Sequence, residues 1–459
     1  MYSLCAHRTL SGGERNSPAA ASHALAGVPN QQESHRVRSR LFTGLWAQPD
    51  FVRLWAGSSV SVFGSLIGGL ALQFTAILWL DASAAEVAIL AASQLVPGFL
   101  VSIAAGVWVD RLRRRRIMIA ADLGRAAALF SVPIAAGFGG LTMAQLYAVG
   151  LVVSTLAVFF DSAYQSYLPT LVQRKDLIEG NAKMQGTASA IEVVSFSISG
   201  WLVQLLRAPG AVAIDAASFV FSAFFVWRIR TPESAPPSPE ERTGFLVEAA
   251  EGFRVVFRDR LLRPIALATA AQSLASQIIS VLFLLYLSGE VGFEPGVLGM
   301  IFAVGGVTSV AGAWVANRGI LLFGGVGPTI AVSALFRAGG ALFMPLCTDA
   351  GWLGVSFLIA NQLVTDPFWT MFNIHDVSLR QSITPERVQG RMFANFRLLE
   401  FGFALAGTAA AAALGATVGL RAGMFAACGL MFVSVGILAA SPVIRVKRAP
   451  PQALAEEVA

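Results

Sequence analysis

The chain has 459 residues, of which 55% are hydrophobic and only 13% are charged, and its formal net charge is +6. A soluble domain carries about 25% charged residues, so this composition excludes an ordinary soluble enzyme and indicates a polytopic membrane protein. The positive charge does not indicate nucleic-acid binding, because the basic residues lie between apolar runs and not on one soluble face.

The cysteines and histidines predict neither a disulfide framework nor a metal site. Cys5, Cys347 and Cys428 are far apart, and three of the four histidines lie within the first 40 residues. A metal-dependent membrane enzyme would need a cluster of such ligands. We therefore expect no metal and no cofactor.

The chain begins with a polar, aperiodic segment over residues 1–40, which has no apolar core after its start and so differs from a signal peptide. We expect residues 1–48 to form a disordered cytoplasmic tail. From Phe51 onward, apolar runs reach the length of about 20 residues that a membrane-spanning helix needs. Twelve such runs are predicted: 51–80, 85–109, 116–138, 141–168, 181–206, 210–229, 263–288, 296–317, 327–347, 351–379, 390–414 and 418–441.

A polar stretch over 230–262 separates the sixth run from the seventh. It opens with several prolines, and its second part, Phe245 to Phe257, alternates apolar and charged residues at helical spacing, which predicts an interfacial helix. The expected organisation is a cytoplasmic linker joining two six-helix bundles, with a short cytoplasmic tail at the end of the chain. The bounds are 49–229 and 263–441 for the bundles, 230–262 for the linker and 442–459 for the tail.

Lysine and arginine are distributed unevenly over the connections. If the N-terminus is cytoplasmic, the even-numbered connections lie inside and hold almost all of the basic residues, whereas the opposite side holds only Arg207 and Arg421. Because basic residues favour the cytoplasmic side, both termini are expected in the cytoplasm and the chain in the cytoplasmic (inner) membrane.

The two halves share sequence at a nearly constant offset. Gly106-Val107-Trp108-Val109 returns as Gly312-Ala313-Trp314-Val315, an offset of 206. Arg125 and Pro133 return as Arg337 and Pro345, an offset of 212, and Glu192 and Glu400 are 208 apart. Two six-helix repeats joined by a long linker are typical of a parallel-repeat transporter.

The loop after the second run contains Gly106, then Asp110-Arg111, then Arg113 to Arg116. This pattern resembles the major facilitator superfamily, and four further stretches resemble its branch of enterobactin exporters and macrolide-efflux permeases. These stretches are Phe51 to Trp55 with Ser61 and Gly64; Ala121-Asp122 with Arg125; Leu168-Pro169 with Leu171-Val172 and Asn181-Ala182; and Ser378 to Gln381 with Thr384-Pro385 and Gly390-Arg391. The resemblance covers about 51–441 and implies an all-α major facilitator fold of twelve transmembrane helices.

The resemblance also implies conformational roles for residues near the cytoplasmic edge. Gly106 allows two helices to approach closely, and Asp110 is expected to latch the outward-open state. Arg111 is a gating candidate, although it also fits an anchor for anionic headgroups. The second-half copy has Ala316 and Asn317 in place of the Asp-Arg pair, so the latch is expected on one side only.

Further gating candidates are charged residues on the third, fourth and eleventh runs. Asp122 and Arg125 are three residues apart, hence on one helix face, where a pair within the helix or with a neighbouring helix is expected. Asp161 lies near the cytoplasmic end of its run, and Arg391 is one of the arginines that could pair there. Arg337 has Ala334 where Arg125 has its acid, so it needs another partner.

Acids deeper in the runs are candidates for proton or substrate handling. Glu192 and Glu400 are each about 13–16 Å into their runs, where burial would allow a carboxylate to bind and release a proton. A hydrogen bond, or a pair of Glu400 with Arg397, is the structural alternative. Asp366 is expected to line the cavity and Asp376 to pair with an arginine, and His375 is either a proton relay or a packing residue. Asp215, after Pro209-Gly210, is interpreted as a helix cap.

The prediction is a secondary transporter that exports a small hydrophobic or amphipathic molecule (drug-like, macrolide-like or siderophore-like) by proton-coupled alternating access. An importer or a lipid-handling permease of the same fold is the alternative. No nucleophile–base pattern or nucleotide-binding loop occurs, so an enzyme is not expected. The expected partners are the substrate, protons and membrane lipids, with no nucleic acid, and the chain is expected to be a monomer.

Overall fold

The computed structural model describes residues 44–172, 176–233, 253–254, 256–384 and 386–448, and these are almost entirely helical, with no strand among them. The all-α class predicted from the sequence is therefore confirmed. Residues 1–43 of the predicted disordered tail and most of the predicted interfacial helix of the linker lie outside the described residues, whereas Gly44–Ala47, within the predicted tail, form a helical turn.

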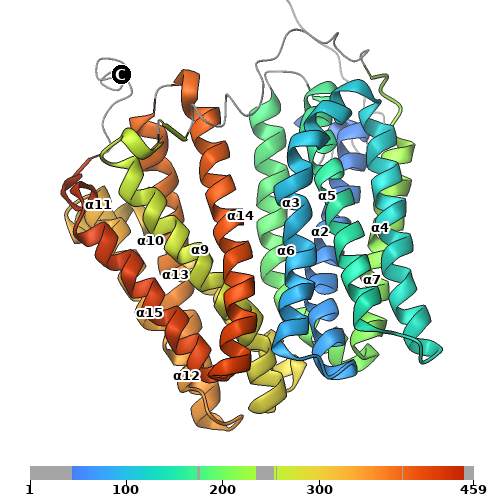
Figure 1. The fold of residues 1–459 in the computed structure, drawn as a ribbon. Helices are drawn as coiled ribbons and strands as arrows, with labels where there is room; N and C mark the ends of the chain where they lie inside the picture. The colour runs from blue at the N-terminus through green and yellow to red at the C-terminus, as the bar shows by residue number, and fades with distance from the viewer. Residues whose placement is uncertain (1–43, 173–175, 234–252, 255, 385, 449–459) are drawn as a thin grey trace, which may run out of the picture. The chain divides into compact units, whose positions relative to one another are not determined.

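The first half contains six long helices (Figure 1). A short turn, Gly44–Ala47, precedes them, and α2 ends in a π-helical turn, Thr75–Trp79. The helices are α2 (Pro49–Phe74), α3 (Ala84–Arg111), α4 (Arg114–Gly137), α5 (Met143–Leu171), α6 (Leu177–Leu206) and α7 (Ala208–Arg228).

The second half repeats this order, and its first helix also ends in a π-helical turn, Tyr286–Glu290. The helices are α9 (Leu262–Leu285), α10 (Pro295–Phe323), α11 (Val326–Ala341), the short α12 (Phe343–Leu346), α13 (Trp352–Ile383), α14 (Glu386–Thr417) and α15 (Leu420–Ala439), followed by a turn at Pro442–Arg445.

Among the described residues, nine helical segments are long and apolar enough to cross a membrane. Three of the twelve predicted runs fall in helices outside this set, namely α3, α6 and α13. Polar residues explain the difference in α13, which carries Asp366, His375, Asp376 and Arg380 within one helix. The number of twelve spanning helices stays a prediction.

The helices pack mainly within their own half. In the first half, α7 packs on α2 and α4, and α5 packs on α3 and α4. In the second half, α9 packs on α14 and α15, and α13 packs on α10 and α11. The main contacts between the halves join α6 to α10 and α3 to α14.

The contacts between the halves lie near the end where α6 stops and α10 begins, which we call the contact end. Gln204 donates a 2.8 Å hydrogen bond to Glu294 there. A Cβ added at Gly200 would lie 2.2 Å from the carbonyl oxygen of Pro295, so the two helices touch through backbone. A Cβ at Gly415 would lie 2.7 Å from that of Ala84, so α14 also lies close to α3.

The opposite end, where α2 begins and α15 stops, is the terminal end. Its buried apolar residues form two separate clusters, one within each half: Phe51, Leu54 and Tyr167 belong to the first, and Leu262 and Phe396 to the second. At the contact end, one continuous cluster combines residues of both halves, such as Ile67 and Leu282. Among the described residues, the halves therefore share a core at the contact end alone.

Candidate functional site

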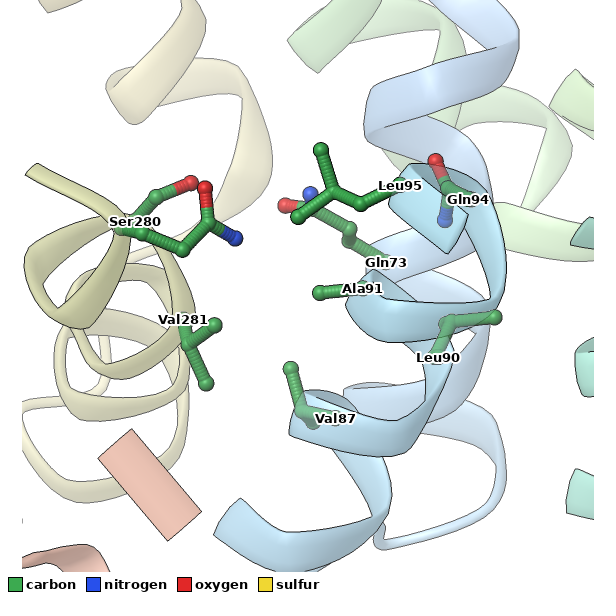
Figure 2. Close-up of a pocket in the computed structure, with 9 residues that line it drawn as sticks. Gln73, Val87, Leu90, Ala91, Gln94, Leu95, Ser280 and Val281 are labelled. Carbon is green, nitrogen blue, oxygen red and sulfur yellow. The ribbon is translucent and has the colours of Figure 1, made fainter. Parts of the chain in front are cut away.

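A pocket of about 120 Å³ lies between the halves, with residues of α2 and α3 on one side and residues of α9 on the other (Figure 2). Three glutamines line it, one from each helix: Gln73, Gln94 and Gln277. Ser280 adds a hydroxyl, and the other lining residues are Val87, Leu90, Ala91, Leu95 and Val281. None of these nine residues carries a charge.

Amides and hydroxyls can both donate and accept hydrogen bonds, so this lining suits an uncharged molecule with polar groups on an apolar frame. The sequence analysis did not identify the three glutamines. Each is an isolated polar residue in an apolar run, which is a usable signal, but only the packing of α2, α3 and α9 shows that they face one pocket.

Asp122 and Arg125 form an ion pair within α4, and both side chains are buried. The Arg125 guanidinium also lies over two aromatic rings, 4.5 Å from the centroid of Phe160 on α5 and 4.0 Å from that of Phe219 on α7. Such cation–π contacts stabilise a guanidinium that has left water. The pair thus ties α4 to its two neighbours, and its role in gating stays a prediction.

Asp215 is not a helix cap, and that interpretation was wrong. The helix α7 begins at Ala208, earlier than predicted, so Asp215 lies two turns inside it. Its side chain is buried and its carboxylate packs on α2, where a Cβ added at Gly68 would lie 2.1 Å from Asp215 Oδ2. Ser218 donates a 2.7 Å hydrogen bond to the backbone carbonyl of Asp215, and its hydroxyl oxygen is 3.4 Å from Asp215 Oδ1.

Asp161 on α5 is exposed and directly follows Phe160. Its carboxylate interacts electrostatically with Arg125 of its own half and with Arg397 on α14 of the other half. Arg391, the other gating candidate on α14, is half-buried. Opposite charges of the two halves thus lie within electrostatic range of each other on α5 and α14.

Arg337, for which the sequence indicated no acid on its own helix, finds neutral partners on α9. Its guanidinium donates to Gln272 Oε1 at 2.5 Å and to Ser276 Oγ at 2.8 Å, and it lies 3.9 Å from the ring centroid of Trp369. Asp366 interacts with it electrostatically from α13, half-buried against Gly305 of α10.

Asp376 and Arg380 form a second buried ion pair, within α13, and Arg380 lies 4.3 Å from the ring centroid of Phe396. Glu400 on α14 is half-buried and interacts electrostatically with Arg380 and Arg397. His375 is buried, and its Nε2 is 2.9 Å from the carbonyl oxygen of Ala316. This contact fits the packing interpretation of His375 better than that of a relay.

Glu192 is exposed, although burial was expected from its depth in α6. It shares a helix face with Ser195 and Ser199, three and seven residues further on, and both of these are buried. The two serines lie closer to the contact end, where α10 covers α6. Glu192 lies beyond that cover, so the parting of the halves toward the terminal end explains its exposure.

The gating candidates Gly106, Asp110 and Arg111 lie in the last turns of α3, and their side chains are outside the described residues. The basic run that follows is described in part. The backbone N–H groups of Arg114 and Arg115 both donate to the carboxylate of Glu233 at 2.9 Å, at the start of α4. An acid at a helix N-terminus is stabilising, so Glu233 fixes α4 to the beginning of the linker.

Comparisons with known proteins identify the class. Among solved structures, the chain is similar to the nucleoside transporter NupG, with a TM-score of 0.66, 13% identity and coverage of 85% of this chain and 98% of that one. A bacterial homologue of the iron transporter ferroportin in the inward-facing state gives 0.68 at 15% identity, covering 85% and 98%. The fold is that of a major facilitator transporter.

The chain belongs to the family described as "Transmembrane secretion effector", which matches residues 43–456. It is 26% identical to macrolide efflux protein A of Streptococcus pyogenes, over 67% of this chain and 78% of that protein. It is 25% identical to the multidrug efflux pump Tap of Mycolicibacterium fortuitum, over 82% and 93%. The resemblance stated from the motifs is confirmed, and the protein is a membrane transporter and not an enzyme.

Proposed function

We propose that this transporter exports a small hydrophobic or amphipathic molecule from the cytoplasm by proton-coupled alternating access. The observation that carries the proposal is the pocket between the halves, because residues of both halves line it and it adjoins the end where they share a core. The efflux activity named for the relatives supports the direction of transport.

The conformation fits one state of such a cycle. Basic residues gather at the terminal end, where Arg114, Arg115 and Arg228 lie, and this favours a cytoplasmic position for that end. Within the part of the chain that the structure describes, the halves are joined by a common core only at the contact end. With the terminal end in the cytoplasm, this conformation would be the inward-open state, in which substrate enters from the cytoplasm.

The two sets of helices, 49–229 and 263–441, would be the bodies that rock about the pocket, with 230–262 as their cytoplasmic linker. Because a substrate shifts such an equilibrium only through its different affinity for the two states, the pocket must change on closure. Its residues come from both bodies, so any rocking changes the distance between Gln277 and the pair Gln73 and Gln94.

The substrate class follows from the lining. Three amides and a hydroxyl among aliphatic side chains favour a molecule with hydroxyl or carbonyl groups and a large apolar part. Macrolide-like and siderophore-like compounds have this character. The pocket would hold one part of such a molecule, since its volume of about 120 Å³ is smaller than a whole drug-sized ligand requires.

Accumulation of a compound panel (macrolides, dyes and siderophores) in an efflux-deficient host tests the proposal. Cells would carry the wild type, Gln277→Ala or an empty vector, with and without a protonophore. We expect lower accumulation with the wild type, loss of this effect with the protonophore, and a weaker effect with Gln277→Ala. Gln381→Ala, at an exposed glutamine near the end of α13, is the matched control.

Higher accumulation with the wild type would favour the importer alternative. An effect that survives the protonophore would exclude proton drive. No change over the whole panel would contradict export of this substrate class.

A further inference from the structure

We propose that Asp122, Arg125 and Asp215 form a proton-binding site inside the first half, in which two buried carboxylates share one guanidinium and one proton. The site lies among α2, α4, α5 and α7, apart from the pocket between the halves. It deepens the proposed function, because it rests on proton-coupled export for its role in transport, although its protonation can be measured without transport.

All three side chains are shielded from solvent, with exposed fractions of 0% for Asp122, 5% for Arg125 and 4% for Asp215. Asp122 pairs with Arg125 within α4, and Asp215 interacts electrostatically with the same guanidinium from α7. Phe219, one turn after Asp215, lies under Arg125, so one face of α7 supplies both the acid and the ring.

The charges in this cluster do not balance. Two ionised carboxylates and one guanidinium would leave a net charge of −1 in the membrane interior. A lone buried charge is costly, and two carboxylates at one site resolve the cost when one of them is protonated. Binding one proton makes the cluster neutral.

An unpaired atom supports this inference independently. Asp122 Oδ2 is buried and has no hydrogen-bond partner among the described residues, although Oδ1 of the same carboxylate pairs with Arg125. The buried hydroxyl of Ser222 on α7 lies close enough to interact with this carboxylate. Burying a carboxylate oxygen without a hydrogen-bond partner costs more free energy when the carboxylate is ionised than when it is protonated. This oxygen therefore marks where the cluster can carry its proton.

The second half supplies a contrast within the same molecule. Arg337, the repeat mate of Arg125, is held by the neutral side chains of Gln272 and Ser276. Asp376 and Arg380 are paired one to one. Among the described buried groups, acids thus outnumber arginines only in the first half. Both halves have an arginine at the repeated position, but only the first half has two buried acids near it.

The charged groups on α2 and α6 do not alter the net charge of the buried cluster. On α2, a Cβ added at Gly64 would lie 3.1 Å from Asp215 Oδ1, so the cluster adjoins this position. Asp50 and Arg53 pair with each other at 2.5 Å, eleven or more residues before Gly64 and so about 16 Å away along the helix. On α6, which also packs on α7, Glu179 pairs with Lys183 at 3.0 Å near the helix start, and Glu192 is exposed.

Asp161 on α5 is the remaining charged group that interacts with Arg125, and it is exposed. Because Asp161 adjoins Phe160, whose ring covers the guanidinium, it lies between the buried cluster and the surface of the helix. If Arg125 turned toward Asp161, Asp122 and Asp215 would lose their cation and would bind a proton more readily. This movement would change how α5 packs on α4 and α7.

Infrared spectroscopy of the purified full-length protein in lipid nanodiscs tests the site. The C=O stretch of a protonated carboxylic acid is separate from the bands of carboxylates. At neutral pH we expect an acid band in the wild type that shifts when aspartate is labelled with ¹³C at its side-chain carboxyl. Asp215→Asn should lose one acid group, and Arg125→Gln, which leaves two acids without a cation, should gain one.

Glu290→Gln is the control, because this carboxylate is exposed at a helix end and should not contribute to the acid band. If Asp215→Asn does not elute as a single monodisperse species, Asp122→Asn replaces it with the same expected loss. The proposal would be overturned if the acid band of the ¹³C-labelled wild type did not shift from its unlabelled position. It would also be overturned if neither Asn variant reduced the acid band. Because no substrate is used, such a result leaves the export assay to decide the transport function separately.

Discussion

At the scale of single residues, the membrane interior of this protein shows two ways of holding an arginine. Arg125 lies between two rings and forms an ion pair with Asp122, whereas Arg337 lies on one ring, donates its hydrogen bonds to neutral side chains and interacts with Asp366 without a direct ion pair. A charge with a charged partner and a charge with dipoles respond differently to deletion, because the first leaves an uncompensated ion behind and the second leaves only unpaired polar groups.

Arg125→Met should therefore destabilise the protein more than Arg337→Met. We expect a cost of about 3–5 kcal/mol at neutral pH for the first, as for breaking a buried ion pair. The second should cost about 1–3 kcal/mol, as for buried polar groups left without a partner. Thermal unfolding in detergent, followed by the loss of monodisperse protein, measures both.

Acid should narrow this difference, because the folded Arg125→Met protein must hold a proton on each of Asp122 and Asp215, and taking up these protons costs less free energy at low pH. Asp366, near Arg337, is half-buried and partly solvated, so Arg337→Met should depend less on pH. Equal effects of the two variants at every pH would contradict the distinction between the arginines.

Adjacent glycines on α2 offer a second test at the residue scale. A Cβ at Gly68 would meet the Asp215 carboxylate at 2.1 Å, whereas a Cβ at Gly69 would have nothing within 4 Å. We expect Gly68→Ala to cost about 1–3 kcal/mol through overpacking. Gly69→Ala should be neutral or stabilising, because alanine favours a helix. A lower melting temperature for Gly69→Ala than for Gly68→Ala would refute the packing of Asp215 on α2.

At the scale of elements, the two halves meet through helix pairs that approach closely at glycines. The α6–α10 contact is the tightest of these, because Gly200 faces the backbone of Pro295 and Gly299. Backbone cannot move aside as a long side chain can, so any side chain at position 200 must separate the helices. The equilibrium between closed and open forms of the contact end should therefore depend on this residue.

Gly200→Leu should reduce closure of the contact end. Cysteines in place of Gln204 and Glu294, which are joined by a hydrogen bond, report closure through oxidative cross-linking. In a background whose native cysteines are replaced by serine, we expect rapid cross-linking that falls several-fold with Gly200→Leu. Gly186→Leu, on the same helix with nothing near its Cβ, is the matched control and should leave the cross-linking rate unchanged.

At the scale of the whole molecule, opposite charges on the two halves favour closure of the terminal end. Asp161 on α5 and Arg397 on α14 attract each other across the opening, with Glu400 also close to Arg397. Such attraction would favour the closed form of the terminal end, which alternating access requires in the outward-open state. Asp161 and Arg397 would thus stabilise the closed terminal end as long as their charges have opposite signs.

Arg397→Asp should lower export at least about fivefold, the scale of a typical coupling energy between conformations. Asp161→Arg combined with Arg397→Asp restores the attraction with reversed signs, and we expect it to recover a large part of the activity. Efflux of a transported compound from preloaded cells measures both. A double variant no better than the single one would show that the two residues do not act as a pair.

The sequence by itself determined the fold class, the repeat and the family of this protein. These depend on the length and apolarity of each run and on local motifs such as Asp110-Arg111, and a helix that crosses a membrane must satisfy its backbone hydrogen bonds within itself. The pairing of Asp122 with Arg125 was also open to prediction, since both lie on one helix face.

Only the tertiary structure decided which polar residues of different helices meet. Asp215 looked like a cap because the start of α7 was misplaced, and its contact with Gly68 depends on how α7 is rotated against α2. The three glutamines of the pocket and the neutral partners of Arg337 likewise come from separate helices. Lipid-facing and protein-facing sides of a membrane helix are equally apolar, so the sequence pattern carries little information on rotation, and packing alone sets it.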